Sequence, residues 1–234
     1  MTYSSFPVEK EGSIPLSLQE FLRPRRVGLL MWDMQKGLAG RALGIEGITK
    51  AAVKLIAAAE AACIPVIWSR HVLPPLELTA GPFLLFLMKK QKVDRPSLLL
   101  PTMQEGMEET EYLPGLTPQP HHLVIPKSQP SLFVDTPLDL RLKTMGIDTL
   151  VIAGVATDIG VEFNCRHAAS LGYYTVVAED ATGSYTKEAH ERSLDFLRGW
   201  TTPVVTSDVI CANWHEASET KDLNQSSRSN RNRS

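Results

Sequence analysis

Short apolar runs alternate with segments of helical periodicity along the chain, and this alternation most constrains the fold. The run VGLLMW over Val27–Trp32 has no alternation of polar and apolar residues, so it predicts a strand buried on both faces. The other predicted strands are Pro65–Trp68, His122–Ile125, Thr149–Ala153, Tyr173–Ala178 and Pro203–Thr206. The predicted helices are Ile48–Ala59, Pro137–Met145, Asp158–Leu171 and Lys187–Arg198. Strands without two-residue polarity that alternate with helices indicate a parallel sheet, and right-handed crossovers make this a three-layer α/β/α domain.

The two ends of the chain differ in composition from its middle. Residues 1–24 are polar and aperiodic, so we expect a leading arm before a domain over residues 25–216. Residues 217–234 hold too little apolar surface to offset the entropy of ordering them, which predicts a disordered polar tail of local basic character. Residues 69–121 interrupt the pattern with many prolines and the run PFLLFLM. This segment predicts a lid, a binding loop or an interface, with the run buried against a lid or a neighbouring subunit.

Composition excludes several classes of protein. The 234 residues have a formal net charge of −2, so no global basic surface is expected to recruit nucleic acid or anionic lipid. No run approaches the roughly 18 apolar residues that a membrane span needs. Three cysteines, Cys63, Cys165 and Cys211, are too few and too scattered for a disulfide framework or a zinc cluster. An odd cysteine count without a signal peptide favours a cytoplasmic location.

Candidate chemistry lies where ligands of open parallel sheets bind, beyond the carboxyl ends of the strands. Asp33 follows the first predicted strand, Arg70 and His71 follow the second, and Lys127 follows the third. An aspartate and a lysine at a cleft can move a proton together, with the lysine balancing the charge. The alternatives are a loop-capping aspartate and a solvated surface lysine. We expect Arg70 and His71 to contact a polar or carboxylate group of the substrate, and Phe133 to form a wall of the pocket.

The segment GVATDIG over 154–160 ends the fourth predicted strand and begins a helix. Unpaired N–H groups at a helix N-terminus attract oxyanions, so backbone donors at Ala156 and Gly160 would hold developing negative charge. Glycine inside a helix costs about 1 kcal/mol relative to alanine. Either the close approach of a ligand or close packing of helix on strand would offset that cost at Gly160.

Three segments carry a family resemblance: LLMWDMQKG at 29–37, PKSQPSLFVDTPLDLRLKTMGIDTLVIAGVATDIGVE at 126–162, and GYYTVVAEDATGS at 172–184. Together they resemble the isochorismatase-like hydrolase superfamily, also called the cysteine hydrolases. The resemblance extends from about Arg26 to Thr206. It implies a six-stranded parallel sheet of order 3-2-1-4-5-6 and a homodimer or homotetramer. It also implies a non-proline cis peptide at Val155–Ala156 that helps to form an oxyanion hole.

Most amidases of this superfamily use an Asp–Lys–Cys triad, which the resemblance places on Asp33, Lys127 and Gly160. Glycine cannot form a thioester, so the usual acyl-enzyme chemistry is excluded at that position. Cys165 lies five residues further on, about 140° around the helix, and is predicted to be a packing residue. True isochorismatases also have glycine at this position. There the aspartate protonates a vinyl ether and water attacks the resulting cation.

The chain departs from the true isochorismatases at two positions. His71 and Ala156 stand where those enzymes have a glutamine and a tyrosine, so the resemblance is to a glycine-bearing branch with the motif TDIGVE. Metal-dependent members pair an aspartate with histidines after the second strand, a spacing that His71 alone does not provide. We therefore expect no catalytic metal and no cofactor, and we expect His121 and His122 on an exposed loop.

Two functions of different classes remain open at this level. The first is a hydrolase that cleaves a vinyl ether or a C–N bond of a small-molecule substrate by Asp33 and Lys127 acid–base catalysis without a cysteine nucleophile. The second is an inactive binding or assembly protein that keeps the fold. Neither function requires a nucleic acid or a membrane as partner.

Overall fold

The computed structural model describes residues 14–200 and 202–217 of the chain. Its centre is a six-stranded parallel sheet of order β3-β2-β1-β4-β5-β6, which confirms the predicted fold class and strand order. The strands are β1 (Val27–Trp32), β2 (Val66–His71), β3 (Leu123–Lys127), β4 (Thr149–Val155), β5 (Tyr174–Gly183) and β6 (Val204–Val205). The α-helices are α1 (Leu18–Phe21), α2 (Ile45–Ala61), α3 (Gly81–Gln91), α4 (Leu138–Met145), α5 (Glu162–Ser170) and α6 (Lys187–Gly199). The labelled elements also include the 3₁₀ turns η1 (Ala39–Arg41), η2 (Leu76–Leu78), η3 (Pro96–Leu98) and η4 (Glu108–Thr110), and the π-helical turn η5 (Thr157–Val161).

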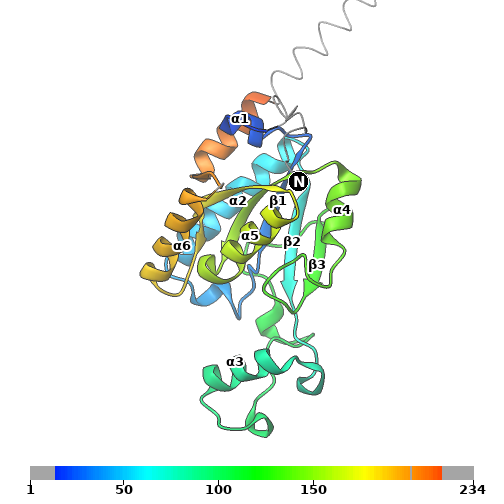
Figure 1. Cartoon of the computed structure of the whole chain (residues 1–234), viewed down its shortest axis with the longest axis vertical. Coiled ribbons are helices and arrows are strands. Elements are labelled where there is room, and N and C mark those ends of the chain that lie inside the picture. The colour runs from blue at the N-terminus through cyan, green and yellow to red at the C-terminus, as the bar shows by residue number, and fades with distance from the viewer. Residues whose placement is uncertain (1–13, 201, 218–234) are drawn as a thin grey trace, which may run out of the picture.

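Helices cover both faces of the sheet, as Figure 1 shows. All six residues of β1 are buried, because Leu29 and Met31 face a core shared with α2 while Leu30 and Trp32 face a core shared with α4, α5 and α6. Because β1 contacts a hydrophobic core on each face, residues on both sides of the strand have to be apolar. The two hydrophobic cores and the sheet between them make the three layers.

Several boundaries differ from the expected ones. Strand β2 extends to His71, which pairs with Lys127 of β3. Strand β5 extends to Gly183, because its pairing with β4 resumes after a register shift between Ile152 and Gly154. Residues 207–217 are helical, an element that the sequence analysis did not predict, and they place Ile210 and Trp214 in the core beside α2.

The predicted arm and tail fall largely outside the described residues, namely 1–13 and 218–234. The described part of the arm forms α1, which a capping box of Ser17 and Glu20 begins, and Leu22 after it is buried in the core.

The run PFLLFLM forms most of α3, within the segment between β2 and β3. This segment lies beyond the carboxyl ends of the strands, away from the sheet (Figure 1). One side of α3 packs on a small third cluster that contains Leu73, Leu87 and Met103, while Leu85 and Phe86 are exposed. Within this chain the run is therefore only partly buried. No helix among the described residues is long and apolar enough to cross a membrane.

Candidate active site

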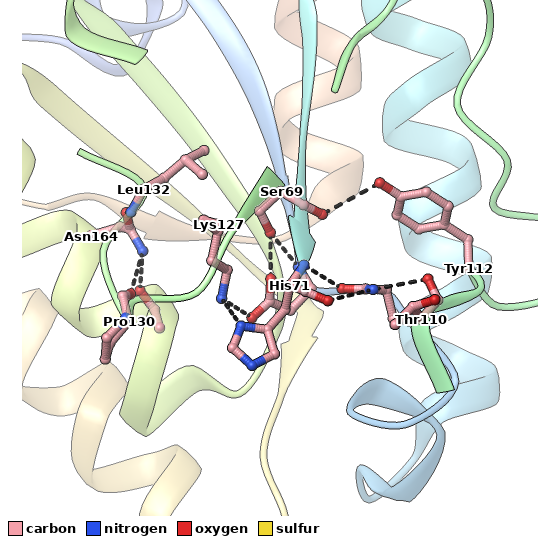
Figure 2. Close-up of polar contacts among 11 residues, drawn as sticks. Ser69, His71, Thr110, Tyr112, Lys127, Pro130, Leu132 and Asn164 are labelled. Carbon is pink, nitrogen blue, oxygen red and sulfur yellow. Dashed lines mark hydrogen bonds and ion pairs between the residues drawn. The ribbon is translucent and has the colours of Figure 1, made fainter. Parts of the chain in front are cut away.

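The carboxyl ends of the three strands β1, β2 and β3 bring four polar side chains together. Asp33 follows β1 directly, Ser69 and His71 occupy alternate positions near the end of β2, and Lys127 ends β3. The parallel register pairs His71 with Lys127, so both side chains leave the sheet at the same level. Figure 2 shows Lys127, His71 and Ser69 around one point at this edge.

Asp33 and Lys127 form a buried ion pair. Lys127 Nζ lies 2.5 Å from Asp33 Oδ2, and the Ser69 hydroxyl donates to Asp33 Oδ1 at 2.6 Å. The backbone N–H of Asp33 donates in turn to Ser69 Oγ at 2.8 Å. Asp33 adopts a left-handed backbone conformation, φ +48°, which aspartate tolerates better than most residues. Each oxygen of this carboxylate therefore accepts a charge-assisted or hydroxyl hydrogen bond.

Burial and charge act in opposite directions on the lysine. Only 3% of the Lys127 side chain is exposed, and this burial lowers the pKa of its ammonium, while the Asp33 carboxylate raises it. A carboxylate and an ammonium held at hydrogen-bond distance in a dry site can exchange a proton between them. The arrangement can therefore act as a base or deliver a proton at one fixed point.

His71 is neutral and oriented by the lysine. Burial first, and the Lys127 charge second, lower the pKa of His71 to about 4. His71 Nδ1 lies 3.3 Å from Lys127 Nζ. An ammonium has only hydrogen-bond donors, so Nδ1 must be the acceptor and the ring proton must be on Nε2.

Gln35 fixes the end of β2, and sequence reasoning missed both it and Ser69. The fully buried Gln35 amide donates to the carbonyls of His71 and Thr110 at 3.0 and 2.9 Å, and its oxygen accepts from the His71 N–H at 2.7 Å (Figure 2). The only signal in the sequence is that both polar residues adjoin apolar strands. Nothing in that pattern specifies their partners.

The turn after β4 joins the site from the other side. The peptide bond Val155–Ala156 is cis, as the resemblance implied. The turn continues into η5 rather than directly into an α-helix, and the Gly160 N–H donates to the Ala156 carbonyl at 3.0 Å. The π-helical turn therefore uses internally the Gly160 N–H that the sequence analysis expected to hold developing negative charge. Asn164 closes the same turn by donating to the Gly160 carbonyl at 2.6 Å and accepting from the Leu132 N–H at 2.8 Å.

Gly160 is required by the ring of Trp32. A Cβ atom at position 160 would lie 1.8 Å from Trp32 Nε1 and 2.1 Å from its Cε2, far inside any allowed contact. Lys127 Nζ lies 4.0 Å from the centroid of the same ring. Close packing of helix on strand therefore accounts for the glycine, one of the two explanations that the sequence left open.

Arg70 and Phe133, the other two predicted substrate contacts, have their recorded partners outside the Asp33–Lys127 ion pair. The Arg70 guanidinium forms a two-pronged ion pair with Glu105, at 2.6 and 2.7 Å, on the opposite side of β2 from Ser69 and His71. Phe133 packs its ring 5.3 Å from that of His167 and 5.7 Å from that of Tyr173.

The cysteines offer no nucleophile at the ion pair. Cys165 lies on the buried side of α5, and burial raises the pKa of its thiol to about 12. Cys63 is exposed at the end of α2, and Cys211 lies in the helical stretch 207–217 beside Lys54.

One group of side chains has the composition of a metal site, away from the ion pair. The ligand atoms of Glu60, His121 and His122 lie within 4.8 Å of one another. However, His122 Nδ1 accepts from Trp68 Nε1 and from the Gln119 N–H, so the ring proton is on Nε2, which faces Glu60 Oε1 at 3.0 Å. Metal binding through Nε2 would require the lone pair there, so these hydrogen bonds oppose it. The expected exposure of His122 is wrong, since its side chain is 1% exposed.

Comparison with known proteins identifies the class. The isochorismatase domain model matches residues 27–209, so the chain belongs to the isochorismatase family and is a hydrolase. Ureidoacrylate amidohydrolase RutB of Pantoea ananatis is 32% identical over 204 residues, covering 77% of this chain and 80% of that protein. The isochorismatase family protein YwoC of Bacillus subtilis is 40% identical over 87 residues, a match that spans only 46% of its length.

Solved structures agree with the fold. The cysteine hydrolase of Pseudomonas syringae pv. phaseolicola superposes with a TM-score of 0.74 at 21% identity, over 83% of this chain and 94% of that one. An isochorismatase family protein from Burkholderia thailandensis superposes with a TM-score of 0.67 at 26% identity, over 82% and 96%.

Proposed function

We propose that this protein hydrolyses a C–N bond or a vinyl ether of a small-molecule substrate by acid–base catalysis, without a covalent intermediate. The buried Asp33–Lys127 pair, with its 2.5 Å contact, supports this proposal most strongly. An uncompensated charge at this depth would be costly, so each of the two groups stabilises the charged form of the other. The relative RutB is named for cleavage of a ureido compound, which favours the C–N bond.

For a C–N bond, water takes the place of the missing thiolate. Asp33 accepts a proton from water as the water oxygen attacks the carbonyl carbon. The same proton then passes to the leaving nitrogen as the C–N bond breaks, giving an acid and an amine. Lys127 holds the carboxylate in place and balances its charge through both steps. For a vinyl ether, the proton goes from Asp33 to carbon, and water adds to the resulting cation as it returns a proton to Asp33. The hemiketal then breaks at the ether C–O bond to give a carbonyl compound and an alcohol.

A panel of amides, ureido acids and vinyl ethers tests the proposal. Wild-type protein is expected to turn over at least one member, and Asp33→Asn to lose activity by 10²-fold or more, as for other general acid–base groups. Asp139→Asn, in an ion pair with Lys143 on α4, is the matched control and should retain activity. Full activity of Asp33→Asn would refute the mechanism.

The second function, binding without turnover, is favoured by one observation. The carboxylate of Asp33 has donors on both oxygens, and the ion pair is almost fully enclosed, as in purely structural pairs. Saturable ligand binding with no turnover of any panel member, in wild type and Asp33→Asn alike, would establish this alternative.

A further inference from the structure

The indole ring of Trp32 occupies the volume into which a side chain at position 160 would extend. Three ring atoms, Nε1, Cε2 and Cζ2, lie within 1.8, 2.1 and 2.5 Å of the Cβ position at residue 160. In the Asp–Lys–Cys triad of the amidases that this chain resembles, the cysteine thiol stands at the position that matches Gly160. Here a tryptophan at the end of β1 fills it from the neighbouring strand.

The ring has little freedom to leave this volume. Trp32 is 2% exposed, and one face of its ring lies against the Lys127 ammonium at 4.0 Å from the centroid. Its backbone is fixed as well, because a Cβ at Gly154 on β4 would lie 2.0 Å from the Trp32 carbonyl oxygen. The two strands approach closely only because residue 154 is glycine, with φ +128°.

The polar edge of the ring has no partner within the protein. Among residues 14–200 and 202–217, Trp32 Nε1 and His71 Nε2 have no hydrogen-bond partner, whereas Trp68 Nε1 donates to His122. Neither Trp32 Nε1 nor His71 Nε2 is fully enclosed by protein. A tryptophan N–H in a nearly buried position normally has an acceptor, because leaving it unpaired costs about 1–3 kcal/mol. Both donors flank Lys127, where the proposed hydrolysis takes place.

We propose that Trp32 is the specificity-determining residue of this site. Its ring excludes a nucleophilic side chain at position 160, and its N–H binds the carbonyl oxygen of the scissile group, beside the His71 N–H. Such a pair of neutral donors stabilises negative charge on that oxygen as water attacks. The substrate class is therefore a carbonyl compound, an amide or a urea, rather than a vinyl ether. This inference rests on the proposed function but is tested separately from it.

Steric exclusion is tested by a size exchange that needs no substrate. In a Cys63→Ser/Cys211→Ser background, Gly160→Cys is expected to lower the Tm by about 6 °C or more. The control is Gly47→Cys, which should change the Tm little because a Cβ there meets nothing within 4 Å. Adding Trp32→Val to Gly160→Cys should raise the Tm again and leave a thiol that iodoacetamide alkylates in the folded state. If Gly160→Cys does not fold, recovery of folding in the double variant is the supporting result. A stable Gly160→Cys, or a double variant no more stable than it, would overturn the assignment.

The donor role is tested by NMR of the indole N–H groups. Trp32→Phe removes one indole signal and so assigns it. Titration with acetamide, a neutral amide probe, should then move the Trp32 signal downfield in a saturable way and leave that of the exposed Trp200 unchanged. An unmoved Trp32 signal overturns the donor role. Absence of turnover with both tests positive would refute hydrolysis alone, whereas turnover with either test negative would refute the role of Trp32 alone.

Discussion

Removal of the Lys127 charge should cost this protein more stability than removal of both charges of the pair. Lys127→Met leaves the Asp33 carboxylate, whose side chain is 8% exposed, with the Ser69 hydroxyl as its remaining side-chain donor. Breaking a buried pair in this way typically costs about 3–5 kcal/mol, because an uncompensated charge stays in the interior. The lost contact of the ammonium with the Trp32 ring adds to this cost.

The double variant Asp33→Asn/Lys127→Met places no charge in the site, so its free energy of unfolding should lie closer to that of wild type. Urea unfolding at pH 7 measures all three, with an unchanged m-value as the check that the states are comparable. Lys187→Met, in an exposed pair with Glu191 at 3.6 Å, is the control and should show no measurable loss. A double variant less stable than Lys127→Met would refute the reasoning, because it would mean that the two side chains contribute independently.

Three further predictions follow from the same contacts. The pKa of His71 is about 4 in the folded protein against an ordinary 6.5, so the unfolded chain binds the extra proton as pH falls from 6.5 to 4. The free energy of unfolding should therefore fall over that range by about 3 kcal/mol, at 1.36 kcal/mol per pKa unit. Urea unfolding at pH 7 and at pH 4.5 measures this loss, which should be smaller for His71→Gln than for wild type. Gln35→Leu leaves three buried backbone groups unpaired and should lower the free energy of unfolding, measured by chemical denaturation, by about 3 kcal/mol or more. Gln91→Leu breaks two backbone hydrogen bonds at an exposed site and should lower it much less. Cys165 should resist alkylation until the protein unfolds while Cys63 reacts at once, as mass spectrometry of timed samples would show; early labelling of Cys165 would contradict its burial.

Part of the site could be predicted because strand ends are readable in a sequence. Asp33 and Lys127 each adjoin an apolar strand, and parallel strands place their carboxyl ends at one edge of the sheet, so both residues were expected at that edge. The side of a strand on which a residue lies is harder to predict. Arg70 was grouped with His71 because they are adjacent, yet adjacent residues of a strand face opposite sides, and β2 continues far enough to separate them.

The sequence by itself determined the parallel sheet, its helical layers and the absence of a cysteine at position 160. These properties follow from local periodicity and from residue identity, which need no knowledge of distant contacts. Only the tertiary structure decided that Ser69 and Gln35 hold the site together. It alone also showed that Trp32 and Gly160, 128 positions apart, share one volume. Such contacts depend on register and on side-chain volume across neighbouring elements, and a linear pattern specifies neither.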